Sequence, residues 1–206
     1  FGPFTYPGGL QRAAQHSWGW AEGKEMPSRH RAFLRVRSSY LFGPGSPDRK
    51  VMPPDYDPVE ELLFVTRVGR ALLDLPQALC LFNPNGECLH PAAEVDRLLR
   101  RKEDQDLLPL ELWANVRFFR TGEHRHLMDT VGMWQLDVPD HEAEFDSQRF
   151  APDDVALFLR NASLYILNNG PIINDGDTMD GPGDIRWQAC SQEKGFADPP
   201  REVLRW

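Results

Sequence analysis

Residues 151–187 read APDDVALFLRNASLYILNNGPIINDGDTMDGPGDIRW, and this stretch determines the expected fold more than any other. Pro152 suits the first turn of a helix, and the two aspartates after it are favourable beside the positive end of the helix dipole. Gly170 suits a left-handed C-cap and Pro171 prevents continuation, so we predict a helix over residues 152–169. Its apolar residues recur at helical spacing and predict one buried stripe: Val155, Phe158, Leu159, Ala162 and Ile166.

The loop after this helix packs four aspartates among glycines, which suggests a metal site, a catalytic site or an acidic docking surface. A calcium loop between two helices needs an oxygen ligand at position 5, glycine at position 6 and glutamate at position 12. Counted from Asp175, these positions hold Met179, Asp180 and Arg186, so the calcium pattern fails. Tight turns in which aspartates cap backbone amides explain the loop more simply. The four aspartates are Asp175, Asp177, Asp180 and Asp184.

The charge of the chain is unevenly distributed. The net charge is −8 over 206 residues, but residues 121–190 hold thirteen acidic residues against four arginines. Residues 1–120 hold fifteen acidic residues against sixteen basic ones. An acidic half repels nucleic acid phosphates and anionic membrane surfaces, and it favours basic proteins or cations. We therefore expect a protein partner with a basic surface, and no binding to nucleic acid or to membranes.

Hydrophobic residues make up 41% of the chain, which is enough for a core, and no apolar run is long enough to span a membrane. The three cysteines lack CxxC spacing, so we expect free thiols in a reducing compartment and a cytoplasmic protein. A Cys80–Cys88 link across the turn between them is the alternative, and it would require an oxidising compartment. The chain begins at Phe1 and not at methionine, so the sequence leaves open whether a segment precedes it.

Strands and helices alternate along the remaining sequence. Apolar and basic residues alternate over residues 30–40, which predicts a half-buried strand with a basic outer row. Asp57 is expected to cap a helix that has Pro58 in its first turn. Residues 78–82 are apolar and precede an Asn-Pro-Asn-Gly turn, so they predict a short buried strand. A second helix is expected to open at His90-Pro91.

The second half of the chain adds strands on both sides of the last helix. Residues 110–120 alternate with both faces largely apolar, which predicts a central strand. A further strand region over residues 126–146 is expected to break near Gly132 and Pro139. Residues 185–190 are the last candidate strand.

The resulting order, β-α-β-α-β-β-α-β, predicts an α+β fold with a mixed or largely antiparallel sheet and helices packed mainly on one face. We expect an N-terminal extension with a short helix over residues 1–27. A single α+β domain is expected over residues 28–190, followed by a polar C-terminal tail over residues 191–206.

The sequence carries no established catalytic motif. It has no GxSxG elbow, no phosphate loop and no dinucleotide-binding fingerprint. His124 and His126 would point to one face of a strand, a geometry that zinc can use, but no recognised spacing supplies a third ligand. The exposed end of a strand explains the pair more simply. We therefore assign no catalytic residue, no metal ligand and no cofactor.

Three segments together resemble a bacterial family known as domain of unknown function 4261. The most specific is LYILNNGPIINDGDTMDG (164–181), which is similar to the family's ending of a helix, Asn-Gly-Pro and Asp-Gly-Asp-Thr. The segments LWANVRFFR (112–120) and DYDPVEELLFVTRVGRALLDLPQALCLFNPNGECL (55–89) agree with the family in kind and order. The resemblance covers roughly residues 28–187, and the chain departs from the usual pattern after Thr178 with the additional MDGPGD.

The resemblance implies a bacterial and mostly cytosolic protein. Members of such families often lie near genes of secretion systems and polymorphic toxins, where small acidic α+β proteins neutralise a partner toxin. Fold analogy alone supplies no mechanism. The implied function is therefore an expectation about context, which the charge pattern has to support.

Together, the acidic half and the missing catalytic constellation favour a non-enzymatic protein-binding protein. The resemblance makes this an immunity protein that neutralises a cognate toxin through an acidic surface, which steers a basic partner. The alternatives are a metal-assisted hydrolase that uses the Asp175–Asp184 loop with His124 or His126, and a scaffold module of a larger assembly. The residues expected to bind the partner are Asp175, Asp177, Asp180 and Asp184, with Asp140 and Glu142 as a second patch.

Overall fold

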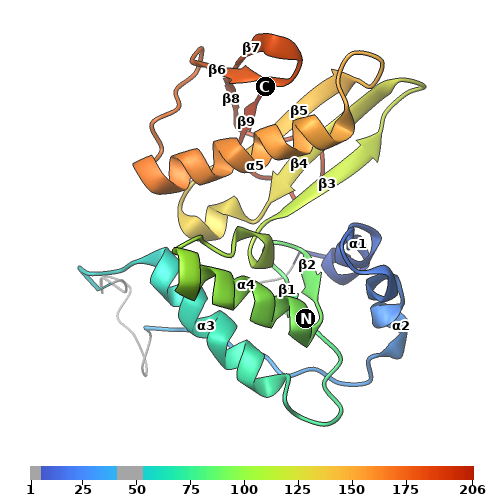
Figure 1. Ribbon diagram of the computed structural model, residues 1–206, viewed down its shortest axis with the longest axis vertical. Helices are drawn as coiled ribbons and strands as arrows, with labels where there is room; N and C mark the ends of the chain where they lie inside the picture. Colours follow the sequence, from blue (N-terminus) through green and yellow to red (C-terminus); the bar gives the residue numbers. More distant parts are fainter. Residues whose placement is uncertain (1–5, 41–52) are drawn as a thin grey trace.

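The structure is a computed structural model that describes residues 6–40 and 53–206. Figure 1 shows two parts stacked along the long axis of the molecule, which we call the helical part and the sheet part. The helical part comprises α1 (Gly9–Gln15), η1 (Ala21–Glu25), α2 (Met26–Arg29), α3 (Pro58–Leu72), β1 (Leu81–Asn83), β2 (Cys88–His90), α4 (Ala92–Gln105) and η2 (Leu110–Leu112). The sheet part comprises β3 (Asn115–Arg120), β4 (Arg125–Val131), η3 (Met133–Leu136), β5 (Asp140–Asp146), α5 (Pro152–Asn169), β6 (Thr178–Gly181), η4 (Pro182–Asp184), β7 (Ile185–Gln188), β8 (Cys190–Gln192) and β9 (Val203–Arg205).

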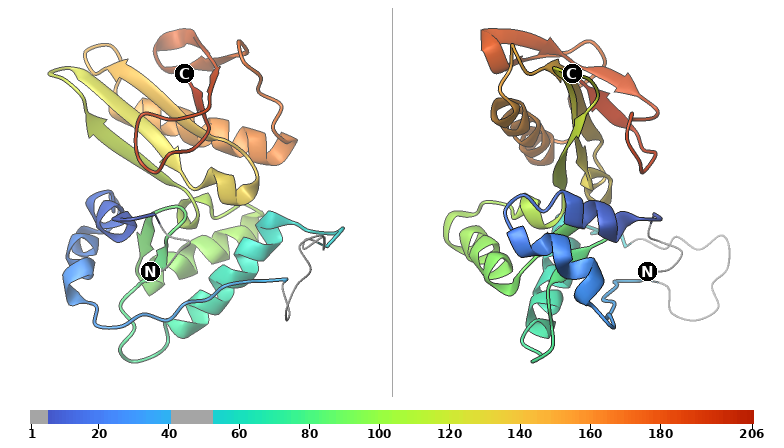
Figure 2. Two further views of the ribbon diagram at one scale, coloured as in Figure 1. Left: turned by 180° about the vertical axis from the view of Figure 1, so that it is seen from behind. Right: turned by 90° about the vertical axis from the view of Figure 1, so that its right-hand side faces the viewer.

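A five-stranded sheet forms the centre of the sheet part, in the order β3-β4-β5-β9-β8. Only the β5–β9 pair is parallel, and the other pairs are antiparallel. The helix α5 lies on one face of this sheet. The C-terminal segment, by which we mean residues 193–202 between β8 and β9, passes over the other face (Figure 2). The predicted α+β class, with a mixed sheet and helical cover on one face, is thereby confirmed.

The long helices begin where the sequence predicts, but α3 ends at Leu72, before the predicted end at Pro76. Asp57 caps α3, because its Oδ1 accepts hydrogen bonds from the backbone N–H groups of Val59 (2.8 Å) and Glu60 (3.3 Å). The helix α5 spans Pro152–Asn169, and Gly170 after it has a φ of 83°. All five residues of the predicted stripe are buried against the sheet or beside it.

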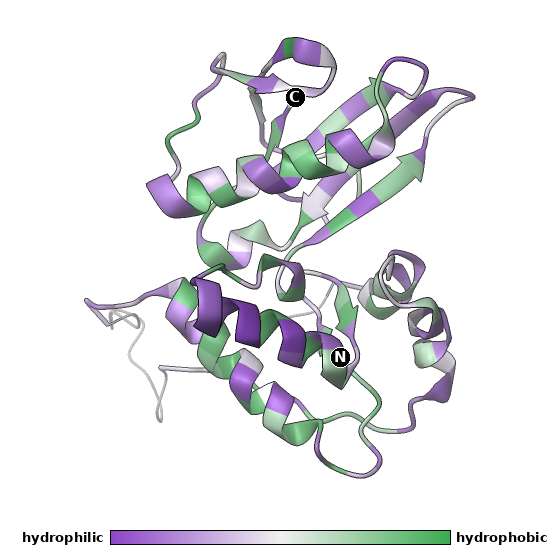
Figure 3. Cartoon of the chain, in the orientation of Figure 1, coloured by the Kyte–Doolittle hydropathy of each residue, from purple (hydrophilic) through white to green (hydrophobic). Residues whose placement is uncertain are grey.

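Two large hydrophobic cores hold the molecule together, and a smaller third one packs α1 against β2. One lies between α5 and the sheet and includes Met128, Phe145 and Phe158. The other lies between α3, α4 and η3, and it includes Trp113 and the α5 residue Ile166, so it joins the helical part to the sheet part. The two helices of this second core differ in hydropathy, since α4 is mostly hydrophilic and α3 carries more hydrophobic segments (Figure 3).

Two strand predictions are wrong. Residues 31–40 form no strand, and every side chain in this segment except that of Val36 is exposed. Alternation alone cannot form a strand here, because a strand also needs a neighbour that pairs with its backbone. Residues 115–120 do form β3, but as an edge strand and not a central one.

The prediction of a polar C-terminal tail is also wrong. Residues 190–192 form β8 and residues 203–205 form β9, which lies inside the sheet between β5 and β8. Val203 and Leu204 are almost fully buried. Two consecutive apolar side chains in a short strand were too weak a pattern to recognise, because their burial depends on pairing with the distant β5.

Within the described residues, none of the helices is both long and apolar enough to cross a membrane.

Candidate functional site

The aspartates of the loop after α5 are exposed, but two of them stabilise the loop itself. Asp177 Oδ2 accepts a hydrogen bond from the backbone N–H of Asn174 (2.7 Å). Asp175 Oδ1 accepts one from the backbone N–H of Ser191 (2.8 Å), which ties the loop to β8. Gly176 has a φ of 88°, as expected for a tight turn. The interpretation of these aspartates as capping groups therefore holds for half of the set.

The other two aspartates lie on the β6–β7 hairpin and point into solvent. Asp180 faces Arg186 across the hairpin at 3.3 Å, and its side chain is 90% exposed. Asp184 has a φ of 54° in the short turn between the strands. Nowhere in residues 6–40 and 53–206 do three His, Cys, Asp or Glu side chains gather closely enough to hold a metal ion. The carboxylates of Asp180 and Asp184 therefore belong to no metal-ligating cluster among the described residues.

The two histidines considered as zinc ligands differ in how deeply their side chains are buried. His124 lies before β4 and is exposed, with Glu123 as its neighbour at 3.9 Å. His126 is buried between the rings of Phe118 and Phe145, at centroid distances of 4.8 and 5.8 Å. Because only His126 lies within the strand, the two side chains do not share an exposed face. The structure therefore gives no support to a shared zinc site.

The expected second docking patch, Asp140 and Glu142, lies inside the molecule, and this is the main correction to the predicted site. Both side chains are fully buried in β5. Asp140 accepts hydrogen bonds from Thr130 Oγ1 (2.9 Å), the Met133 N–H (3.1 Å) and Arg201 Nε (3.0 Å). Glu142 accepts hydrogen bonds from Arg205 and from the Phe196 N–H. Neither carboxylate can contact a partner.

These two carboxylates belong to a charge network on the sheet face opposite α5. At its centre, Arg117 of β3 donates two hydrogen bonds to Asp129 of β4, at 2.9 and 2.5 Å. Arg201 donates to Asp129 (2.7 Å) and to Asp140, so one aspartate is shared by two arginines. Asp129, Asp140 and Arg117 are fully buried. The network binds the C-terminal segment onto the sheet.

The same network reaches the helical part through Glu87. This residue follows the Asn83–Gly86 turn, and its carboxylate accepts hydrogen bonds from Arg117 (3.0 Å) and from Arg12 of α1 (2.9 Å). Its backbone φ is 50°, which is unusual for a residue with a side chain. The Asn-Pro-Asn-Gly turn, which the sequence marked only as a turn, therefore places the acid that joins three distant segments.

Burial and pairing act in opposite directions on the ionisation of the network. For Arg201, burial disfavours the charged form, but Asp140 and Asp129 outweigh this effect and raise its pKa above the ordinary value. Removing one member of such a network leaves an uncompensated buried charge, which is the costly case for buried ion pairs. The network is thus a structural element with high sensitivity to substitution.

Burial also lowers the pKa of His141 in β5, from the ordinary 6.5 to about 3. Its Nδ1 accepts a hydrogen bond from the Trp206 indole (3.1 Å), and its Nε2 has no partner within the described residues. The unfolded chain therefore takes up a proton below pH 6.5 that the folded protein does not bind. The contribution of His141 to the free energy of unfolding is fully present above pH 6.5, and it is lost as the pH falls from there towards 3.

We expect the free energy of unfolding to fall by about 1.4 kcal/mol per pH unit below pH 6 on account of this single group. Urea denaturation at pH 7.0, 6.0 and 5.0 measures the total slope, and the His141→Phe variant should lose about that much of it. An unchanged slope in His141→Phe would show that the histidine is protonated in the folded state.

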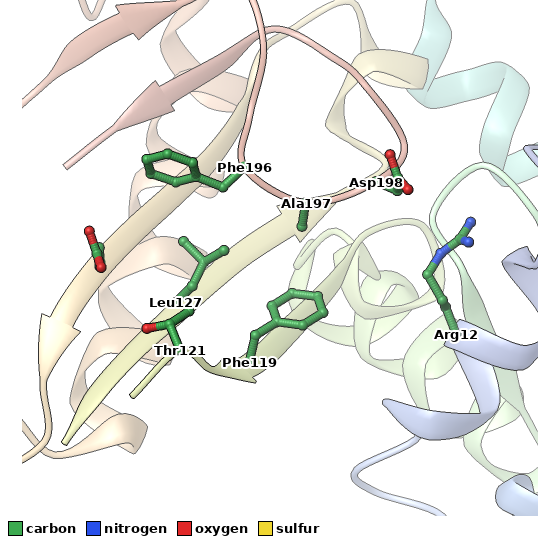
Figure 4. Close-up of a pocket in the computed structure, with 8 residues that line it drawn as sticks. Arg12, Phe119, Thr121, Leu127, Phe196, Ala197 and Asp198 are labelled. Carbon is green, nitrogen blue, oxygen red and sulfur yellow. The ribbon is translucent and has the colours of Figure 1, made fainter. Parts of the chain in front are cut away.

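A groove lies beside the charge network, on the same face of the sheet, with a volume of ≈ 530 Å³. Its walls combine apolar and charged side chains, and it opens between the strands β3 to β5 and the segment that carries Phe196 (Figure 4). We use "the groove" for this feature. Its lining residues are Arg12, Phe119, Thr121, Leu127, Glu144, Phe196, Ala197 and Asp198.

Residues 129–206 match a family model described as Domain of unknown function (DUF4261). The match covers 78 of the 206 residues, which is less than half of the chain. The match confirms the family recognised from the sequence, with a range that starts at residue 129 and includes the C-terminal strands. The DUF4261 region contains the segment 164–181, whereas the similar segments 55–89 and 112–120 lie outside it. No curated protein and no solved structure matches the chain.

The DUF4261 region supplies only part of the charge network. Asp129, Asp140 and Arg201 lie within the matched residues, whereas Arg117 and Glu87 come from the preceding part of the chain. Sequence reasoning missed both the network and the groove. The available pattern was one charged residue inside each of three neighbouring strands, on the same face of the sheet: Arg117, Asp129 and Glu142.

Proposed function

We propose that this chain is a non-enzymatic protein-binding protein that acts as an immunity protein and neutralises a cognate toxin with a basic surface. The supporting observation is where its acidic residues lie. Three acids of residues 121–190, namely Asp129, Asp140 and Glu142, are buried and neutralised by arginines. The remaining ten acidic residues are at least partly exposed, against four exposed arginines. The surface of this region is therefore strongly acidic, although less so than the sequence count indicates.

The loop between α5 and β7 suits recognition because it is held in place before any partner binds. The Gly176 N–H donates to the Ala189 carbonyl (2.7 Å), and the Ala189 N–H donates to the Asp177 carbonyl (2.8 Å). With the hydrogen bond from Ser191 to Asp175, these contacts fix the backbone. A preformed loop loses less conformational entropy on binding, so its exposed carboxylates can act at lower cost.

Recovery of the partner tests the proposal directly. The full chain is purified from its native host at low salt, where electrostatic association is strongest, and the bound proteins are identified by mass spectrometry. The partner is then expressed alone and together with this chain. Growth arrest by the partner that this chain relieves would support the immunity function. A stoichiometric partner without toxicity would instead indicate a scaffold, and no partner at low salt would contradict the proposal.

Neutralising the outer aspartates of the loop should slow association with that partner. We choose Asp180→Asn with Asp184→Asn, because asparagine tolerates the positive φ of Asp184. We expect the association rate to fall by about threefold to tenfold at low salt, and the difference to shrink as salt is added. Stopped-flow or surface-based kinetics measure the rate.

The matched control removes the same charge from the helical part, with Glu103→Gln and Asp104→Asn at exposed positions of α4. This double variant should retain the rate of the unmodified protein within about twofold. Equal rate losses in both variants would show that overall charge, and not the loop, steers the partner.

A further inference from the structure

We propose that the groove binds an arginine side chain of a basic protein partner, with the guanidinium against the phenylalanine rings and near Glu144 or Asp198. The inference relies on the proposed function only for the basic character of the partner. It concerns the sheet face opposite α5 and not the Asp175–Asp184 loop, so each can fail without the other.

The walls of the groove are apolar and partly open to solvent. Leu127 forms the floor with 5% of its surface exposed, and Phe119 is half-buried beside it. Phe196 lies on the facing segment with 60% of its surface exposed. Figure 4 shows Phe196 on one side of the opening and Phe119 with Leu127 on the other. An extended side chain with an apolar stem would cover surface that now contacts water.

Both rings already contact a guanidinium of the protein itself. The Cζ atom of Arg117 lies 5.2 Å from the centroid of Phe119, and that of Arg205 lies 3.7 Å from the centroid of Phe196. These distances lie within the range of favourable cation–π contacts. The rings of the groove are thus placed where guanidinium groups are accepted, in a part of the sheet that has a high density of carboxylates.

The charges of the lining favour a cation over an anion. Glu144 and Asp198 are both exposed, and Glu144 has Arg125 as its neighbour at a distance of 3.3 Å. Arg12 is the single basic residue among those that line the groove, and its guanidinium is bound to Glu87 and to the Pro7 carbonyl. An entering guanidinium therefore meets two exposed carboxylates, of which Glu144 also lies beside Arg125 and Asp198 beside the Tyr6 side chain, whereas an entering anion meets one arginine that is bound to Glu87.

The chemistry favours arginine over lysine. A guanidinium is planar, is less strongly hydrated than an ammonium group and stacks on aromatic rings while it donates to a carboxylate. An ammonium group would have to leave a tightly held hydration shell to reach the same position. Aromatic pockets that accept an arginine are typical centres of protein interfaces.

The test uses small probes and the full chain, so it does not depend on an identified partner. N-acetyl-arginine methylamide is titrated at low salt while backbone amide resonances are followed by NMR, in parallel with the lysine and citrulline equivalents. We expect saturable shifts of Phe119, Leu127 and Phe196, with arginine at least about threefold tighter than lysine. Citrulline, which has the same shape without the charge, should not saturate.

Two variants probe opposite sides of the groove. Phe196→Ala removes the exposed ring and Glu144→Gln removes one carboxylate, and each should weaken the binding of the arginine probe by at least about threefold. The control is Leu157→Ala, since Leu157 is 58% exposed on α5 across the sheet and should leave the affinity unchanged.

Three results would overturn the proposal. The first is the absence of saturable shifts at the groove, and the second is equal binding of citrulline, which would indicate an apolar groove without preference for a cation. The third is a shift of the same amides on raising the protein concentration without probe, because a second copy of the chain would then cover the groove. None of these results would alter the outcome of the partner recovery or of the loop variants.

Discussion

Gly86→Ala is expected to prevent stable folding. A Cβ atom added at Gly86 would lie 1.7 Å from the carbonyl oxygen of Trp113 and 2.6 Å from its carbonyl carbon. Both atoms belong to the backbone, so no side chain can rotate to make room. The Cα of Gly86 also lies 2.6 Å from where a Cβ on Gly132 would be, so glycines form both sides of this contact.

The loss should amount to about 4 kcal/mol or more of the free energy of unfolding, which is comparable to the whole stability of many domains. Urea denaturation followed by circular dichroism measures it, or the protein will be recovered only in the insoluble fraction. The matched control is Gly19→Ala, since no atom outside its neighbours lies within 4 Å of the added Cβ. If the Gly86→Ala and Gly19→Ala variants denature at the same urea concentration, the β1–β2 turn does not approach the Trp113 backbone as closely as the structure shows.

Arg117→Met should have the second largest effect. Methionine keeps much of the apolar stem but removes the hydrogen bonds to Asp129 and Glu87, both of which stay buried. Breaking a buried ion pair by removing one partner typically costs about 3–5 kcal/mol. We expect a loss of this size in urea denaturation, with retained secondary structure at zero denaturant if the protein folds.

Arg120→Met is the control, because Arg120 lies on the same strand but is exposed and, within residues 6–40 and 53–206, donates only to backbone carbonyls. The Arg120→Met variant should lose less than about 1 kcal/mol of the free energy of unfolding.

The double variant Arg117→Met with Asp129→Leu removes both charges of the central pair. It should be less destabilised than the sum of its single variants, and strict additivity would mean that the two groups do not interact.

The helices were predictable because their determinants are local. The capping aspartate at Asp57 and the glycine after α5 lie next to the elements that they delimit, and hydrophobic spacing marks the buried side of α5. Strands were less predictable, since residues 31–40 have a suitable alternation but form no strand. The same limitation concealed β9, whose pairing with β5 brings together residues that are 63 positions apart.

The candidate site was also predictable only in its local features. The sequence by itself determined the resemblance to the family matched over residues 129–206, the capped helix, the tight acidic loop and the excess of acids in the second half of the chain. Only the tertiary structure decided which acids face outwards. Asp140 and Glu142 are as acidic in sequence as Asp180 and Asp184, but Arg201 and Arg205 approach them from more than 60 positions away. Burial and ion pairing depend on such distant contacts, and the composition of a segment does not contain them.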